Sequence, residues 1–84
     1  MRNAKAAFAI TPSDAVVALH TIPGLPQLAQ RLYVGVGGNV RVITEMGQTL
    51  TYPAATGSYL FVSVIQVLAT GTTATGIIGE ILGA

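Results

Sequence analysis

One stretch of this sequence, SYLFVSVIQVL at positions 58–68, restricts the fold more than any other, because it is apolar on both faces. Its content of β-branched and aromatic residues favours a strand over a helix. In a strand, one face carries Tyr59, Phe61, Ile65 and Val67. The other face carries Leu60, Val62, Val64 and Leu68. A strand of this kind is covered on both faces, so one face packs on the core and the other needs a partner or another part of the chain.

The composition points in the same direction. A chain of 84 residues forms one domain with a thin stability margin, and such domains lean on disulfides, metals or oligomerisation. There is no cysteine, one histidine and only three carboxylates, so we expect no disulfide, no metal site and no cofactor. Charged residues make up 8%, against roughly 25% in an ordinary soluble domain. We therefore expect a homo-oligomer whose neutral surface is covered by neighbours.

From residue 30 onward the sequence alternates with a period of two, which indicates strands. The alternating segments are RLYVGV (31–36), VRVITE (40–45) and TLTY (49–52), separated by the turn signals GGN and MGQ. This pattern predicts a meander of hairpins, with Pro53 ending the third strand. IIGEIL (77–82) is expected to be the last strand, with Gly79 at a bulge or a close contact. The predicted fold class is all-β: a small antiparallel β-barrel or sandwich of about five strands.

Residues 1–29 differ from the rest and are interpreted as an extended N-terminal arm on a β-domain of residues 30–84. The arm holds three of the four prolines, and Pro23, Gly24 and Pro26 are typical of turns or extended chain. A short helix over 15–19, capped by Ser13 or Asp14, and an extended course fit the sequence equally well. Such an arm is able to wrap over a neighbouring subunit.

The sequence argues against a membrane span, a signal peptide and nucleic-acid binding. No residue from Met46 to Gly79 is charged, but the densest apolar part is only 11 residues long, and a spanning helix needs roughly 20. The apolar run after Arg2 and Lys5 is interrupted at Pro12, which is atypical of a signal peptide. A net charge of +1 offers no electrostatic attraction for nucleic acid.

Two glycine-rich motifs lack the residues that nucleotide binding requires. GVGG (35–38) lacks the third glycine of a dinucleotide fingerprint, since Val40 stands there, and a strand rather than a helix is expected to follow. GTTATG (71–76) has the glycine spacing of a P-loop, but Ile77 and Ile78 stand where lysine and Ser/Thr are needed. We instead expect the threonine hydroxyls of this segment to satisfy backbone groups where two final strands join in a crowded place.

The sequence also contains the residue types of a hydrolase triad, in Ser13, Asp14 and His20, but they lie on the arm without an evident rigid scaffold. Nothing in the sequence pairs Asp14 with either glutamate for acid–base chemistry. The three tyrosines, Tyr33, Tyr52 and Tyr59, lack the basic groove that base stacking needs and are interpreted as core or interface residues. No catalytic, cofactor-binding or metal residue is assigned, and the protein is not expected to be an enzyme.

Three stretches together resemble a known family: ITPSD (10–14), RLYVGVGGNVRV (31–42) and VLATGTTATGII (67–78). In this order and at this spacing they are similar to the head spike base proteins of alphaproteobacterial gene transfer agents and related tailed bacteriophages. The resemblance covers Ile10 to Ile78, and ATGTTATGI is its most specific part. It implies a small β-structured virion protein without catalytic activity.

The resemblance also implies a position and partners. Such a protein sits at capsid vertices of a phage-like particle head, as a ring that is expected to be a pentamer. Its partners are then the major capsid protein and a spike fibre protein. The alternative is a capsid decoration or tail-associated binding module that displays its loops, with Gly57 and Gly71–Gly76 marking them; a membrane-active protein ranks third.

Overall fold

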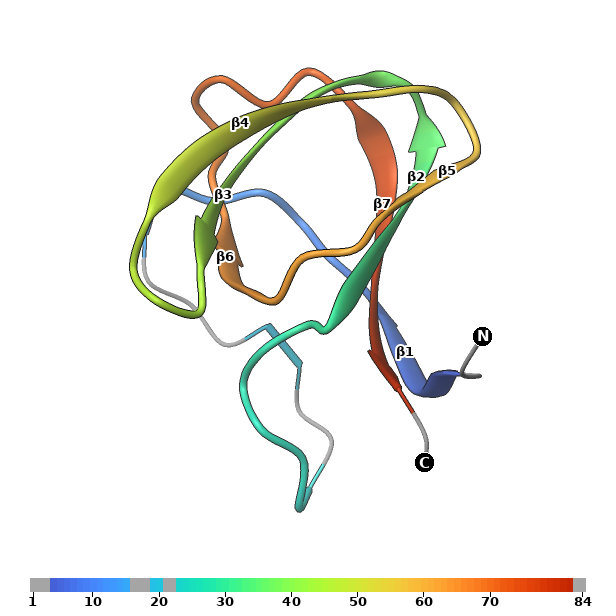
Figure 1. The fold of residues 1–84 in the computed structure, drawn as a ribbon, viewed down its shortest axis with the longest axis vertical. Helices are drawn as coiled ribbons and strands as arrows, with labels where there is room; N and C mark the ends of the chain where they lie inside the picture. The colour runs from blue at the N-terminus through green and yellow to red at the C-terminus, as the bar shows by residue number, and fades with distance from the viewer. Residues whose placement is uncertain (1–3, 16–18, 21–22, 83–84) are drawn as a thin grey trace.

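The computed structural model describes residues 4–15, 19–20 and 23–82 and contains two antiparallel sheets (Figure 1). The four-stranded sheet has the order β1-β7-β2-β5, and the three-stranded sheet has the order β4-β3-β6. The strands are β1 (Ala4–Ala9), β2 (Arg31–Val36), β3 (Gly38–Thr44), β4 (Thr49–Ala54), β5 (Ser58–Leu60), β6 (Val64–Val67) and β7 (Thr75–Leu82). This confirms the all-β antiparallel prediction, and the two ladders do not join into one closed ring within the described residues.

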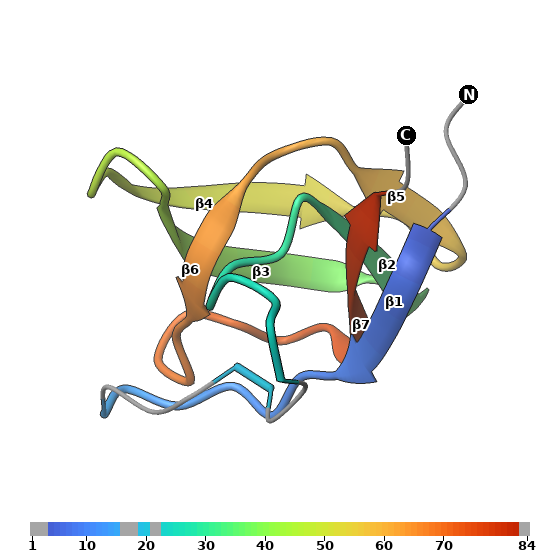
Figure 2. The same cartoon turned by 90° about the horizontal axis from the view of Figure 1, so that it is seen from below.

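The core lies between the two sheets, whose strands cross steeply (Figure 2). Alternate residues of each strand face inward, as a period of two requires. The residues with no exposed surface are Ala29, Leu32, Val34, Val40, Val42 and Val64. Branched aliphatic side chains from both sheets therefore form one core in the space left by the crossing.

The GGN segment is a corner between sheets and not a hairpin turn, so the predicted meander is wrong at this point. β2 pairs with β7 and β5, whereas β3 pairs with β4 and β6. The chain changes sheets at Gly37, where an added Cβ would lie 2.7 Å from the Thr56 backbone nitrogen. Glycine suits a tight turn and a close backbone approach alike, so the motif alone did not distinguish them.

The predicted long strand over 58–68 is also divided between the sheets. Its first part is β5, which pairs with β2, and its second part is β6, which pairs with β3. The even-numbered face does turn toward the core, through Leu60, Val62 and the fully buried Val64. The opposite face is exposed at Tyr59, Phe61 and Ile65. The prediction of two apolar faces is thus correct, and the odd-numbered face is exposed at these three residues but buried at Val67.

Other sequence predictions are confirmed, with small adjustments. A tight turn joins β3 to β4, with Gly47 at φ +86°. Pro53 does not end its strand, since β4 continues to Ala54; it stands on an edge strand, where its missing N–H costs least. β7 is the last strand, and Gly79 makes a close contact, because a Cβ there would lie 2.6 Å from the Phe8 ring.

The segment predicted as an N-terminal arm begins with β1, which pairs with β7 in the four-stranded sheet. The chain then crosses to the other sheet, where the Ser13 N–H donates to the Val67 carbonyl. The Gln66 side chain donates to the Ser13 carbonyl at 2.9 Å, which ties this crossing to β6. Residues 16–18 of the suggested short helix lie outside the described residues.

We expect Val64→Asp to unfold the protein, because Val64 has no exposed surface and no partner in the core for a carboxylate. An unpaired buried charge costs roughly 3–5 kcal/mol, a large part of the stability of a small domain. The neighbouring variant Ile65→Asp is the control, since Ile65 is 41% exposed. Thermal unfolding followed by circular dichroism compares the two, and a wild-type melting temperature for Val64→Asp would contradict the assigned core.

Candidate docking surface

An exposed aromatic ridge, defined here as Tyr33, Tyr59 and Phe61, lies on the outer surface of the four-stranded sheet. Tyr33 on β2 is directly opposite Tyr59 on β5, so both side chains share one face. Their ring centroids are 5.2 Å apart in an edge-on arrangement, and the rings of Tyr59 and Phe61 stack at 6.2 Å. Tyr59 is 42% exposed and Phe61 71% exposed, which is unusual for aromatic side chains in contact with one another.

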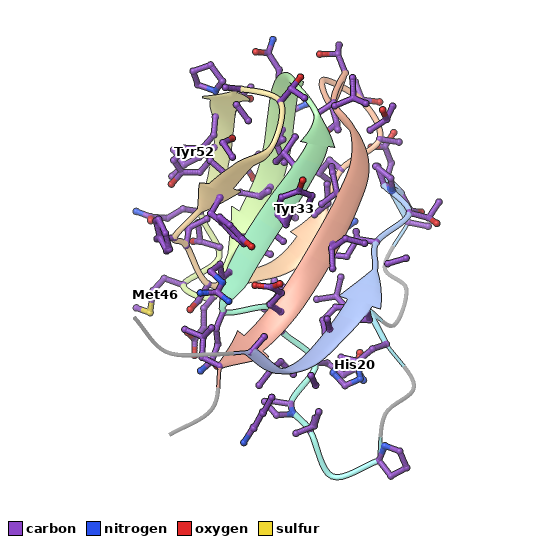
Figure 3. All side chains as sticks on the ribbon, turned by 90° about the vertical axis from the view of Figure 1, so that its right-hand side faces the viewer. His20, Tyr33, Met46 and Tyr52 are labelled. Carbon is purple, nitrogen blue, oxygen red and sulfur yellow. The ribbon has the colours of Figure 1, made fainter. Side chains whose placement is uncertain are left out.

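The ridge continues an apolar row that crosses all four strands in register. Ala9 on β1 pairs with Ile78 on β7, Ile78 pairs with Tyr33, and Tyr33 pairs with Tyr59. Figure 3 looks onto this outer face, with Tyr33 projecting from β2. In the described part of the chain, no further strand or helix lies over this row. The row is therefore accessible to another molecule.

One ion pair lies beside the ridge and contributes no net charge to it. The Arg31 Nε lies 2.5 Å from Oε1 of Glu80, its cross-strand partner, and the two side chains are only 8% and 14% exposed. The Arg31 guanidinium carbon also lies 4.9 Å from the centre of the Tyr59 ring, which is a cation–π geometry. The pair holds Tyr59 in place and neutralises its own charges, so the surface suits a neutral, apolar partner.

Other exposed apolar residues lie outside the ridge, and Met46 is the most exposed of them. Met46, at the tip of the β3–β4 turn, is 87% exposed, and it stands at the margin of the molecule in Figure 3. Met46 therefore provides a matched comparison for the ridge.

The three tyrosines singled out in the sequence do not act together. Tyr33 and Tyr59 meet on the ridge, whereas Tyr52 on β4 packs partly buried against the core. Phe61 joins the ridge although its position at the end of β5 is not evident from spacing alone. Phe61 was nevertheless part of the second apolar face of the 58–68 segment, and the sequence analysis predicted that this face needs a partner or another part of the chain to cover it.

The suggested triad residues each have another structural role. The His20 Nε2 hydrogen-bonds the Pro26 carbonyl at 2.7 Å, and its ring lies 4.7 Å from that of Phe8. The Asp14 carboxylate accepts hydrogen bonds from the hydroxyl and the N–H of Thr70, and the hydroxyl bond is the main cause that lowers the pKa of Asp14. The two hydrogen bonds of Asp14 tie the segment after β1 to the loop after β6.

The GTTATG segment connects the last two strands, β6 and β7, as the sequence predicted, and its hydroxyls bind the backbone of β3. The Thr72 Oγ1 accepts from the Arg41 N–H at 2.9 Å, and the Thr73 Oγ1 accepts from the Asn39 N–H at 2.8 Å. Gly71 has φ +93°, and a Cβ there would lie 2.9 Å from the Arg41 side chain. The small residues therefore allow close packing without any charge.

The described ranges contain neither a metal-binding cluster nor a membrane-spanning helix. No three His, Asp or Glu side chains gather there in a way that would hold a metal ion. The same ranges contain no helix with the length and apolar character to traverse a bilayer.

A solved structure shares both fold and sequence with this chain. A chain in the structure described as the capsid of a native gene transfer agent particle, computed with C5 symmetry, superposes with a TM-score of 0.75. The two sequences are 37% identical, and the match covers 94% of this chain and 84% of that chain. A comparison with models of known protein families finds no match, and a comparison with curated proteins finds none either.

We expect Thr72→Val to destabilise the protein by about 1 kcal/mol, because it leaves the Arg41 N–H without its acceptor while keeping the volume. Thr72→Ser is the control, since it keeps the hydroxyl. Urea unfolding of both variants measures the difference. Equal midpoints for the valine and serine variants would show that the hydroxyl does not hold the loop to β3.

Proposed function

This protein belongs to the family of that chain from a gene transfer agent capsid. We propose that it is the base that anchors a head spike or fibre at the capsid vertices of a phage-like particle. Family membership makes the chain a structural protein of the virion. The identity of 37% extends over nearly the whole chain, so the membership concerns the complete β-fold and not a shared fragment.

Symmetry supports the vertex position. The capsid that contains the related chain was computed with C5 symmetry. Copies around such an axis contact each other through heterologous interfaces, in which two different surfaces of each subunit meet. The sequence resemblance to head spike base proteins implies the same axis. We therefore infer a ring, with five copies as its expected size.

The observation in the molecule that carries the proposal is the aromatic ridge. A neutral ridge with Phe61 71% exposed, on a chain with only 8% charged residues, is typical of a surface covered in an assembly. Aromatic residues are enriched in the centres of protein interfaces, where they supply much of the binding free energy. We infer that the ridge forms one side of the contact between neighbouring copies in the ring.

The remaining partners follow from the same position. A vertex base touches the major capsid protein on one side and a spike fibre protein on the other, and it needs no catalytic activity and no cofactor. The alternative, a decoration or tail-associated module that displays its loops, is less favoured by the geometry. The 71–76 loop that it would display is hydrogen-bonded to β3 at Asn39 and Arg41.

We expect the purified protein to form one ring species with five times the chain mass of 8.6 kDa, measured by native mass spectrometry. Phe61→Ser should shift the ring toward monomers, because it removes the most exposed side chain of the ridge. Met46→Ser should leave the ring intact, although Met46 is even more exposed. A monomeric wild type, or equal masses for the two variants, would contradict the role of the ridge.

The vertex role has its own test in the particle. Deletion of the gene should give heads that assemble and package normally but lack spikes in electron micrographs. Complementation with the wild-type gene should restore the spikes. Heads that keep their spikes without this protein would rule out the base role, whatever the ring mass.

A further inference from the structure

The aromatic ridge supplies one of the two surfaces that a ring contact needs. If the ridge of one copy met the ridge of the next, the same surface would stand on both sides, and the contact would be isologous. Such a contact generates a twofold axis and ends at a dimer. A ring of five copies therefore requires a second, different surface that faces the ridge.

A projecting loop, called here the proline loop and defined as residues 23–28, lies on a different side of the molecule from the ridge. Figure 1 shows it ahead of β2, extending beyond both sheets. In Figure 3 it lies below the sheet and not over the outer face from which Tyr33 projects. Its sequence, PGLPQL, carries no charge. Both prolines and Gly24 are exposed, and Leu25 is half-buried.

The tip of the proline loop has the backbone of a defined turn. Proline fixes the φ of residue 23 near −65°, and Gly24 has φ +79°, which together match the two central positions of a type II turn. An added Cβ at Gly24 would meet no atom within 4 Å, so glycine is needed there for its φ and not for a close contact. The tip consequently faces open space in the single chain.

Side chains close the base of the proline loop. The Gln27 Oε1 accepts a hydrogen bond from the Leu19 N–H at 2.9 Å, and the Gln27 Nε2 donates to the His20 carbonyl at 2.9 Å. His20 is 6% exposed, bonds the Pro26 carbonyl through Nε2 and packs its ring against Phe8 of β1. These contacts fix the loop to the four-stranded sheet. A loop already held in one conformation loses little entropy when it binds.

The proline loop and the ridge are chemically complementary. Proline-rich segments dock on surfaces lined by exposed aromatic side chains, because their restricted backbone presents apolar rings at a low entropic cost. Both surfaces are also neutral, since the loop has no charged residue and Arg31 beside the ridge is paired with Glu80. A contact between them therefore buries no unpaired charge.

We propose that the proline loop of one copy packs on the aromatic ridge of the next copy, with Pro23 and Pro26 against Tyr59 and Phe61. The contact joins two different surfaces, so its repetition around an axis closes a ring. This inference rests on the proposed ring and adds the second surface that the ring needs. His20 and Gln27 are then positioning residues, because they hold the loop in the conformation that binds.

Photo-crosslinking identifies what covers the ridge. The probe is p-benzoylphenylalanine in place of Phe61, which keeps an aromatic side chain there. Rings assembled from equal amounts of isotope-labelled and unlabelled chains distinguish links between copies from links within one copy. We expect the main link between copies to join position 61 to residues 23–28. Pentamers in which position 61 links mainly to another segment would overturn this inference and leave the ring in place.

The same probe in place of Pro23 decides the matter from the other side if the probe at position 61 prevents the ring. It should link mainly to residues 59–61 of another copy. A main link elsewhere would again overturn the inference. A wild type that is monomeric, or that stops at a dimer, would overturn the proposed ring and this inference with it.

A matched pair of proline variants measures the contribution of the loop. Pro26→Ser removes an exposed ring of the loop and keeps the carbonyl that His20 binds, whereas Pro53→Ser removes an exposed proline of β4 in the other sheet. The concentration at which half of the ring dissociates, measured by analytical ultracentrifugation, should rise about tenfold or more with Pro26→Ser and less than about twofold with Pro53→Ser. Equal concentrations for the two variants would contradict a contact through the proline loop.

Discussion

The structure depends on the burial of branched aliphatic residues between two crossed sheets. A chain of 84 residues without disulfides has only one such core, so nearly every strand must contribute to it. The chain meets this demand by changing sheets four times between β2 and β7, at Gly37, at 55–57, at 61–63 and at 68–74. Each change keeps the apolar alternation directed at the same core, as Leu60 and Val64 show on either side of one crossing.

The crossings explain the unusual composition between the strands. Where two sheets meet, backbones approach closely and backbone N–H groups need acceptors. Glycine at positions 37 and 71 removes the Cβ that would collide, and Thr72 and Thr73 provide oxygen acceptors for β3. Hydroxyls satisfy these groups without the desolvation cost of a charge.

The use of all strands in one core also determines which surfaces stay uncovered. With its strands committed to one core, the described part of the chain places no layer over the outer face of the four-stranded sheet. Tyr59 and Phe61 remain exposed there beside the half-buried Tyr33, and β1 lies at the opposite edge of the same sheet.

Much of this was already determined by local features of the sequence. Alternation predicted all-β structure, the threonine-rich segment predicted a charge-free junction, and the doubly apolar stretch at 58–68 predicted a face that needs a partner. Tertiary structure decided where strands pair. A glycine pair such as Gly37 and Gly38 permits both a hairpin and a corner, and an 11-residue apolar run fits one strand or two. Local preference is equal for these choices, so long-range packing selects between them; it also brings Phe61 beside Tyr59 and leaves β1 as the open edge.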